Sequence, residues 1–85
     1  MNEHNLPMPT TTHGGRTVVA SCWLNDDEDY GPVTYALLTF AAGEEFYAVE
    51  EWEIVAGGAP VKIYGCSYPN IIPAAEGFSE LIGGY

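Results

Sequence analysis

Residues 33–55 read VTYALLTFAAGEEFYAVEEWEIV, and this stretch decides the fold. Apolar side chains alternate along residues 33–41 and again along residues 46–55, with the short AGE sequence of residues 42–44 between them. A period of two is typical of strands, and a short connection containing glycine predicts an antiparallel hairpin. The second strand divides its side chains between two faces: Phe46, Ala48, Trp52 and Ile54 on one, Tyr47, Val49, Glu51 and Glu53 on the other.

Glu50 is the exception to this alternation, because its position places a carboxylate on the apolar face. Burying a charge without a partner is costly. Two arrangements avoid that cost: a bulge at Glu50–Glu51 that shifts the pleat, or a position at the margin of the sheet where water reaches the side chain.

The flanking segments add two more strands. Residues 16–24 are apolar and β-branched, which predicts a first strand, and residues 61–64 predict a short strand at a sheet edge. Four consecutive acids followed by Gly31–Pro32 cannot continue a strand, so residues 25–32 are expected to form an exposed connection.

The last part of the chain predicts a helix. Asn70 is a typical N-cap, Pro73 fits the first turn, and Gly83–Gly84 ends the helix. Gly77 weakens such a helix by up to ~1 kcal/mol relative to alanine, so the helix must dock on the sheet. One apolar stripe at helical spacing provides the docking face: Ile71, Ala74, Ala75, Phe78, Leu81 and Ile82.

These elements predict one α+β domain over residues 16–85. We expect an antiparallel meander of three to four strands with one carboxyl-terminal helix packed on one face. Residues 1–15 show no apolar period, which predicts a flexible tail that carries both His4 and His13. Because one helix covers one face, the face of Tyr47 and Val49 would be left in need of a partner.

The balance of charge is the unusual feature of the composition. The 85 residues include 12 Asp and Glu against Arg16 and Lys62, which gives a net charge of −10. Direct binding of nucleic acid or of an anionic membrane needs several cations on one face, so both are excluded. The sequence shows no transmembrane stretch and no secretory signal, and we therefore expect a cytoplasmic protein.

Catalytic and metal chemistry have weak support in the residues, so we expect no enzyme and no cofactor. A histidine-dependent reaction would need an ordered tail that places His13 against Cys66 or Ser67. The spacing Asn25-x-Asp27-x-Asp29 resembles the opening of a calcium loop, but its required glycine and glutamate are replaced, and no metal site is expected. Without export, Cys22 and Cys66 are expected to be free buried thiols, with a single bridge as the alternative.

The acids as a set are the candidate binding surface. If they gather on one side, their field would steer a basic partner and imitate the phosphates of nucleic acid. The alternative is that they only keep a small apolar domain soluble. Tyr and Trp are also favoured in protein interfaces, so Tyr47 and Trp52 join the acids as candidate binding residues. The expected partner-binding residues are Asp26, Asp27, Glu28, Asp29, Glu44, Glu45, Glu51, Glu53, Tyr47 and Trp52.

The carboxyl-terminal half also carries a resemblance. The ending from Asn70 through Tyr85, after the strand that begins at Phe46, resembles small acidic accessory proteins of actinobacterial bacteriophages. That resemblance implies a protein of the host cytoplasm that binds and inhibits or redirects a host component. It implies no catalytic residues.

Both lines of reasoning favour a non-enzymatic binding protein whose partner is a host protein with a basic or nucleic-acid-binding surface. The alternative is a structural or assembly protein that forms homo-oligomers, in the simplest case a homodimer, through an exposed sheet face or edge.

Overall fold

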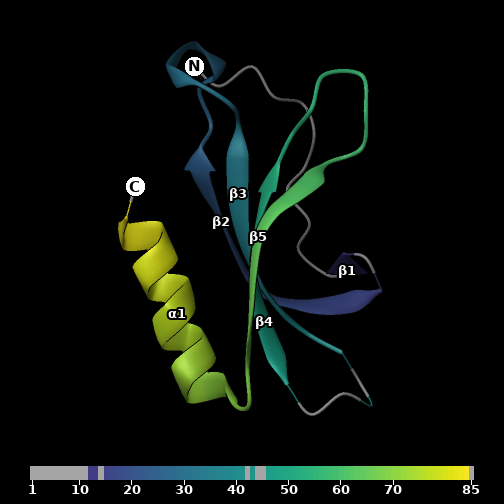
Figure 1. The fold of residues 1–85 in the computed structure, drawn as a ribbon, viewed down its shortest axis with the longest axis vertical. Coiled ribbons are helices and arrows are strands. Elements are labelled where there is room, and N and C mark those ends of the chain that lie inside the picture. Colours follow the sequence, from purple (N-terminus) through teal and green to yellow (C-terminus); the bar gives the residue numbers. More distant parts are fainter. Residues whose placement is uncertain (1–11, 14, 42, 44–45, 85) are drawn as a thin grey trace.

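The computed structural model describes residues 12–13, 15–41, 43 and 46–84. These residues form five strands, one short 3-10 helix and one α-helix (Figure 1). In chain order they are β1 (Thr12–His13), β2 (Arg16–Asn25), η1 (Glu28–Tyr30), β3 (Thr34–Phe40), β4 (Tyr47–Glu53), β5 (Val61–Tyr68) and α1 (Ile71–Gly83).

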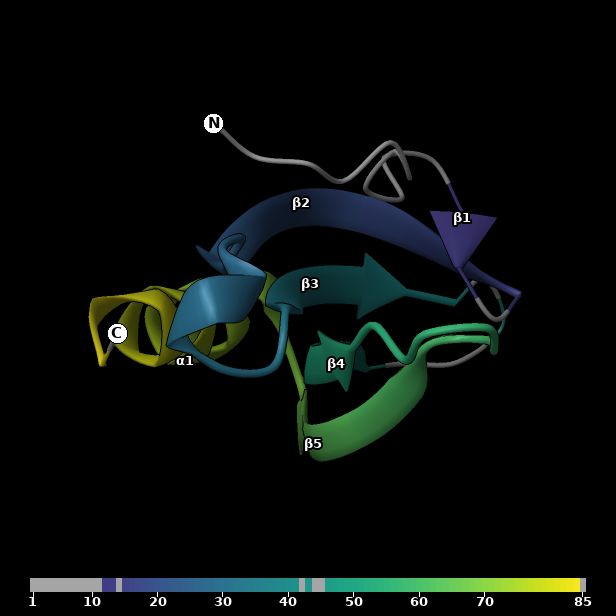
Figure 2. The same cartoon turned by 90° about the horizontal axis from the view of Figure 1, so that it is seen from above.

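The strands form one antiparallel sheet in the order β1-β2-β3-β4-β5, so every strand pairs with its neighbour in the sequence. The predicted α+β meander with a helix on one face is confirmed, with five strands in place of three to four. Figure 2 shows that the sheet curls into a half-barrel. Register shifts in β2, between Val18 and Ala20 and between Trp23 and Asn25, insert extra residues that bend a strand in this way.

The fifth strand comes from the segment that the sequence analysis assigned to a flexible tail. Thr12 and His13 pair with Thr17 and Arg16, and the turn between them uses Gly15 at a positive φ of 81°. The tail prediction is therefore wrong for these two residues. Residues 1–11 and 14 lie outside the described part of the chain.

The helix packs on the face of the sheet that carries Tyr47 and Val49. Ala74 is fully buried against Leu38 and Val49, and a ring of half-buried apolar side chains surrounds them. The expectation that this face lacks a partner is wrong, because α1 covers it (Figure 1). The half-buried members are Ala20, Tyr47, Tyr68, Phe78 and Leu81.

The other face is the concave side of the curl, and it holds a second cluster. Val18, Tyr35 and Leu37 are buried there, with Trp23, Trp52 and Ile54 packed against them. Because both faces of β3 are apolar, every residue from Thr34 to Thr39 is buried. Burial of this central strand on both sides makes it the core of the fold.

The boundaries of α1 agree with the sequence prediction. Asn70 is the N-cap with an extended backbone, although its side chain makes no capping hydrogen bond, and Gly84 is the C-cap. Gly77 is needed for close approach, because a Cβ at this position would overlap the hydroxyl and ring of Tyr68. Ile71 and Ala75 of the predicted stripe remain exposed, so the buried stripe is narrower than the predicted one. Among the described residues, no helix has both the length and the apolar character needed to cross a membrane.

Candidate partner-binding site

A pocket of about 420 Å³ lies on the helix-side face, beyond the residues that α1 covers. The volume is within the range of ordinary ligand pockets. The register places Thr34 opposite both Asn25 and Glu53, which brings three strands together in its wall. The lining residues are Leu24, Asn25, Tyr30, Pro32, Thr34, Glu51, Glu53 and Ile63.

The acidic connection between β2 and β3 lies beside this pocket. Asn25 and Tyr30 directly precede and follow the four acids of the connection, and both line the pocket. Its own hydrogen bonds fix its shape. The backbone N–H of Asp29 donates to Asp27 Oδ1 at 2.9 Å, and the Nδ2 of Asn25 donates to the carbonyl of Pro32 at 2.8 Å. Asp27 thus caps η1, while Asp26, Glu28 and Asp29 remain exposed.

Two carboxylates from β4 complete the acidic surface. Glu51 and Glu53 are two residues apart, so both point to the helix-side face and into the pocket wall. Glu51 is only 6% exposed and Glu53 is half-buried. We call the two carboxylates that line the pocket, together with the four acids of the adjoining β2–β3 connection, the acidic pole: Asp26, Asp27, Glu28, Asp29, Glu51 and Glu53.

Thr34 supplies a polar atom without a partner at the same place. The residue is 5% exposed, and its Oγ1 is buried with no hydrogen-bond partner in the described structure. Buried hydroxyls are normally hydrogen-bonded, and leaving one unpaired costs roughly 1–3 kcal/mol. An unpaired hydroxyl in the wall of a pocket is the kind of group that a ligand can satisfy.

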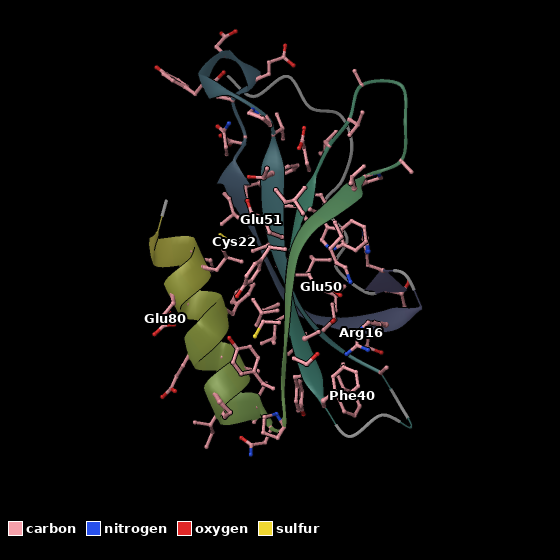
Figure 3. All side chains as sticks on the ribbon, in the orientation of Figure 1. Arg16, Cys22, Phe40, Glu50, Glu51 and Glu80 are labelled. Carbon is pink, nitrogen blue, oxygen red and sulfur yellow. The ribbon has the colours of Figure 1, made fainter. Side chains whose placement is uncertain are left out.

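The two cations of the described chain make their identified contacts elsewhere. The Nε of Arg16 donates to Thr39 Oγ1 at 2.9 Å, and its guanidinium lies 4.9 Å from the ring centroid of Phe46. The Nζ of Lys62 lies 3.9 Å from Glu50 Oε2. Figure 3 shows Arg16 and Glu50 on the side of the sheet opposite Glu51 and α1. Both contacts lie outside the acidic pole.

Of the predicted partner-binding residues, the structure therefore brings together those of the acidic pole. Tyr47 and Trp52 do not join them, since they pack in the cores of opposite faces. The rings of Tyr47 and Phe40 lie 4.9 Å apart, and the ring of Trp52 lies 4.2 Å from that of His13. Glu44 and Glu45 lie outside the described residues.

Glu50 takes neither of the two arrangements that the sequence suggested. The β3–β4 register runs without a break through Glu50, which is 5% exposed on the concave face. The register shift between Glu51 and Trp52 affects only the pairing with β5. The carboxylate is satisfied inside the curl, because Trp52 Nε1 donates to its Oε1 at 3.1 Å and Lys62 lies beside its Oε2.

The polar contact of His13 with Tyr35 was not predicted from the sequence. The His13 Nε2 and the Tyr35 hydroxyl share a hydrogen bond of 3.0 Å on the concave face. Burial, and then the negative charge of Glu50, raise the pKa of Tyr35 above its usual value. Alternation alone could have placed Tyr35 and Glu50 on one face, but nothing in the tail indicated that His13 would reach them.

The helix-side face carries both thiols. Cys22 and Cys66 are free, as expected, but they are half-buried where full burial was predicted. A hydrogen bond with the Cys66 thiol, followed by burial, raises the pKa of Tyr68 to about 12. Cys66 is paired with Val49 and so faces α1, whereas His13 lies on the concave face. The sheet thus separates His13 from Cys66, whereas Ser67, which pairs with Ala48, lies on the same face as His13.

Among the described residues, no three His, Cys, Asp or Glu side chains are grouped closely enough to hold a metal ion. Comparisons of the chain with protein-family models, with curated proteins and with solved structures give no significant match.

Proposed function

We propose that this chain is a binding protein without catalytic chemistry, and that its acidic pole attaches to a basic surface of another protein. The observation that carries the proposal is the convergence of two acid groups, distant in sequence, around one pocket with a partly apolar wall. Asp26, Glu28 and Asp29 of the loop are exposed, and β4 holds Glu51 and Glu53 at a fixed spacing. A surface of this kind resembles a run of phosphates, which suits a nucleic-acid-binding partner.

The charge of the chain supports fast, salt-sensitive association. Six of the 12 acids belong to the acidic pole in a protein of net charge −10. Complementary fields of this type raise association rates from about 10⁵–10⁶ to as much as 10⁸–10⁹ M⁻¹s⁻¹ at low salt. The resemblance to phage accessory proteins adds the setting of the proposal: the host cytoplasm, with a host protein bound and inhibited or redirected.

A pair of double variants tests the proposal at equal charge. Asp26→Asn with Glu28→Gln neutralises two exposed acids of the acidic pole and leaves the capping residue Asp27 in place. Glu76→Gln with Glu80→Gln neutralises two exposed acids of α1 as the control. Each protein serves as bait in a lysate of an actinobacterial host, and the captured protein is then measured in isolation.

The association rate of that captured protein, at low and high salt, gives the decisive comparison. We expect the pole variant to associate several-fold more slowly, with a smaller salt dependence, because long-range steering depends on charge near the contact. The helix control should behave like the natural chain. Equal rates and equal salt dependence in both variants would refute the proposal.

The assembly function remains the second candidate because of β5. This strand is one of the two edges of the sheet, and it exposes Val61, Ile63 and Tyr64 with no acid along its eight residues. Exposed apolar edges are templates for pairing with another strand. A light-scattering mass near 9.2 kDa would exclude this candidate. A stable multiple that falls to the monomer in a Tyr64→Lys variant would favour it.

A further inference from the structure

We propose that the pocket of the acidic pole is a receptor for a single arginine side chain. The inference rests on the proposed function and deepens it, because it names the group by which the partner is anchored. It is also independent in one respect: a pocket that binds a guanidinium can be tested with that group alone.

The unpaired Thr34 hydroxyl is the first reason for a ligand at this place. The side chain is about nineteen-twentieths buried and its Oγ1 has no partner in the described structure, yet the residue lines the pocket. An arginine guanidinium carries five N–H donors and no acceptor. One of those donors can satisfy the hydroxyl oxygen while the others address carboxylates.

The spacing of the two glutamates favours a guanidinium over an ammonium. Residues i and i+2 of an antiparallel strand are about 7 Å apart along the chain, and Glu51 and Glu53 have this relation. A compact ammonium acts as a point charge and would sit against one carboxylate at a time. The planar guanidinium presents donors in several directions, so it can address both carboxylates.

The rest of the wall fits the aliphatic stem of an arginine. Leu24, Pro32 and Ile63 provide apolar surface beside the two carboxylates. Arginine buries its methylene groups along such surface while its charged end reaches polar partners. Tyr30 stands at the rim with 85% of its surface exposed, so its ring is free to cover the guanidinium in a cation–π contact.

A titration with capped amino acids tests the proposal on the whole chain. The probes are N-acetyl-arginine methylamide, its uncharged analogue N-acetyl-citrulline methylamide, and N-acetyl-lysine methylamide. Binding is followed by amide chemical shifts of the ¹⁵N-labelled protein. We expect the arginine probe to bind, to shift residues 24–34 and 51–53, and to bind at least about tenfold more tightly than the citrulline probe, because charge-assisted hydrogen bonds are the strong ones.

Two variants tie the binding to the named atoms. Thr34→Val removes the unpaired hydroxyl at constant shape, so it should leave thermal stability unchanged or higher and weaken arginine binding about threefold or more. Glu53→Gln should weaken it about tenfold, while Glu80→Gln on α1 should leave it unchanged. If Thr34→Val is as stable as the natural chain, weaker arginine binding by this variant cannot be due to loss of folding.

Three results would overturn the proposal: no saturable shifts at the pocket, a lysine probe bound as tightly as the arginine probe, or Thr34→Val and Glu53→Gln variants with natural affinity. These failures are distinct from failure of the proposed function. A basic protein that binds the natural chain and not the pole variant, without any binding of the arginine probe, would retain the acidic surface and reject the arginine pocket. Arginine binding without any protein partner would do the reverse.

Discussion

Replacing Gly77 with alanine sets two opposing effects against each other at one position of α1. Alanine is better than glycine in a helix by about 1 kcal/mol, so an exposed site would gain stability. Here the new Cβ would lie 2.6 Å from the Tyr68 ring carbon Cζ, which is 0.8 Å short of the 3.4 Å at which ordinary contact begins. The ring cannot retreat freely, because it packs against the cluster of Leu38, Val49 and Ala74.

Overpacking of this kind costs about 1–3 kcal/mol, which exceeds the gain in helix propensity. We therefore expect Gly77→Ala to lower the free energy of unfolding by up to about 2 kcal/mol. In a domain of this size each kcal/mol lost lowers Tm by roughly 4–8 °C. Thermal and urea unfolding, each followed by circular dichroism, measure both quantities.

Gly83→Ala provides the matched control, since no atom lies within 4 Å of a Cβ at that helical position. It should leave Tm unchanged or raise it slightly. In a Tyr68→Val background, Gly77→Ala should lower the free energy of unfolding much less than it does in the natural chain, because the overlapping ring is gone. A Gly77→Ala protein as stable as Gly83→Ala would show that α1 does not rest on Tyr68, and the docking described for the helix would be wrong.

Three further outcomes follow from the two cores. His13→Ala should cost about 1–2 kcal/mol of unfolding free energy, through the lost hydrogen bond to Tyr35 and the lost ring contact with Trp52, whereas a tail residue would cost nothing. Phe78→Ala should cost about 2–3 kcal/mol in urea unfolding, below the value for a fully buried ring because Phe78 is half-buried; an unchanged midpoint would contradict the packing of α1. The raised pKa of Tyr68, about 12 against 10.0, favours the neutral phenol in the folded state, so its contribution to stability is intact below pH 10 and is lost as the pH rises toward 12. Between pH 10 and 12, the free energy of unfolding should fall less steeply with pH for Tyr68→Phe than for the natural chain. The same pH dependence in both proteins would contradict the contact with Cys66.

The strands and the helix could be predicted because each has a clear period. Alternation placed Tyr35 and Leu37 opposite Ala36 and Leu38, and the caps at Asn70 and Gly84 bound the helix where the structure has it. The side on which the helix docks could not be predicted in the same way. Both faces of the β3–β4 hairpin are apolar, so the pattern is symmetric, and only the packing of Ala74 against Leu38 and Val49 decides between them.

Two long-range contacts escaped the sequence for a related reason. His13 belongs to a two-residue strand, which is too short to show any period, and its partners Tyr35 and Trp52 are distant in the chain. Glu50 breaks the pattern of its own strand; Trp52, two residues along, supplies one compensating contact, and the distant one comes from Lys62 on β5. A local pattern reports that a residue is out of place without reporting which distant group makes its position tolerable.

The candidate site was predicted in part. The acids themselves are plain in the sequence, but their convergence depends on the pairing of Thr34 with both Asn25 and Glu53. The unpaired Thr34 hydroxyl is not visible in a sequence at all, since threonine at the start of a strand is ordinary. Tyr47 and Trp52 do not join the acidic pole, because a domain with two small cores uses both side chains to fill them.

Chemical-shift mapping of the ¹⁵N-labelled chain with its captured partner decides whether the acidic pole is the binding surface. We predict that the largest changes fall on residues 24–34 and 51–53 and on Ile63, the positions that form or flank the pocket. The same spectra should show small changes along α1 and along the residues of β5 other than Ile63. Changes confined to Val61–Tyr68, or spread over α1 with the pocket residues unmoved, would contradict the account and move the binding surface to the sheet edge or to the helix.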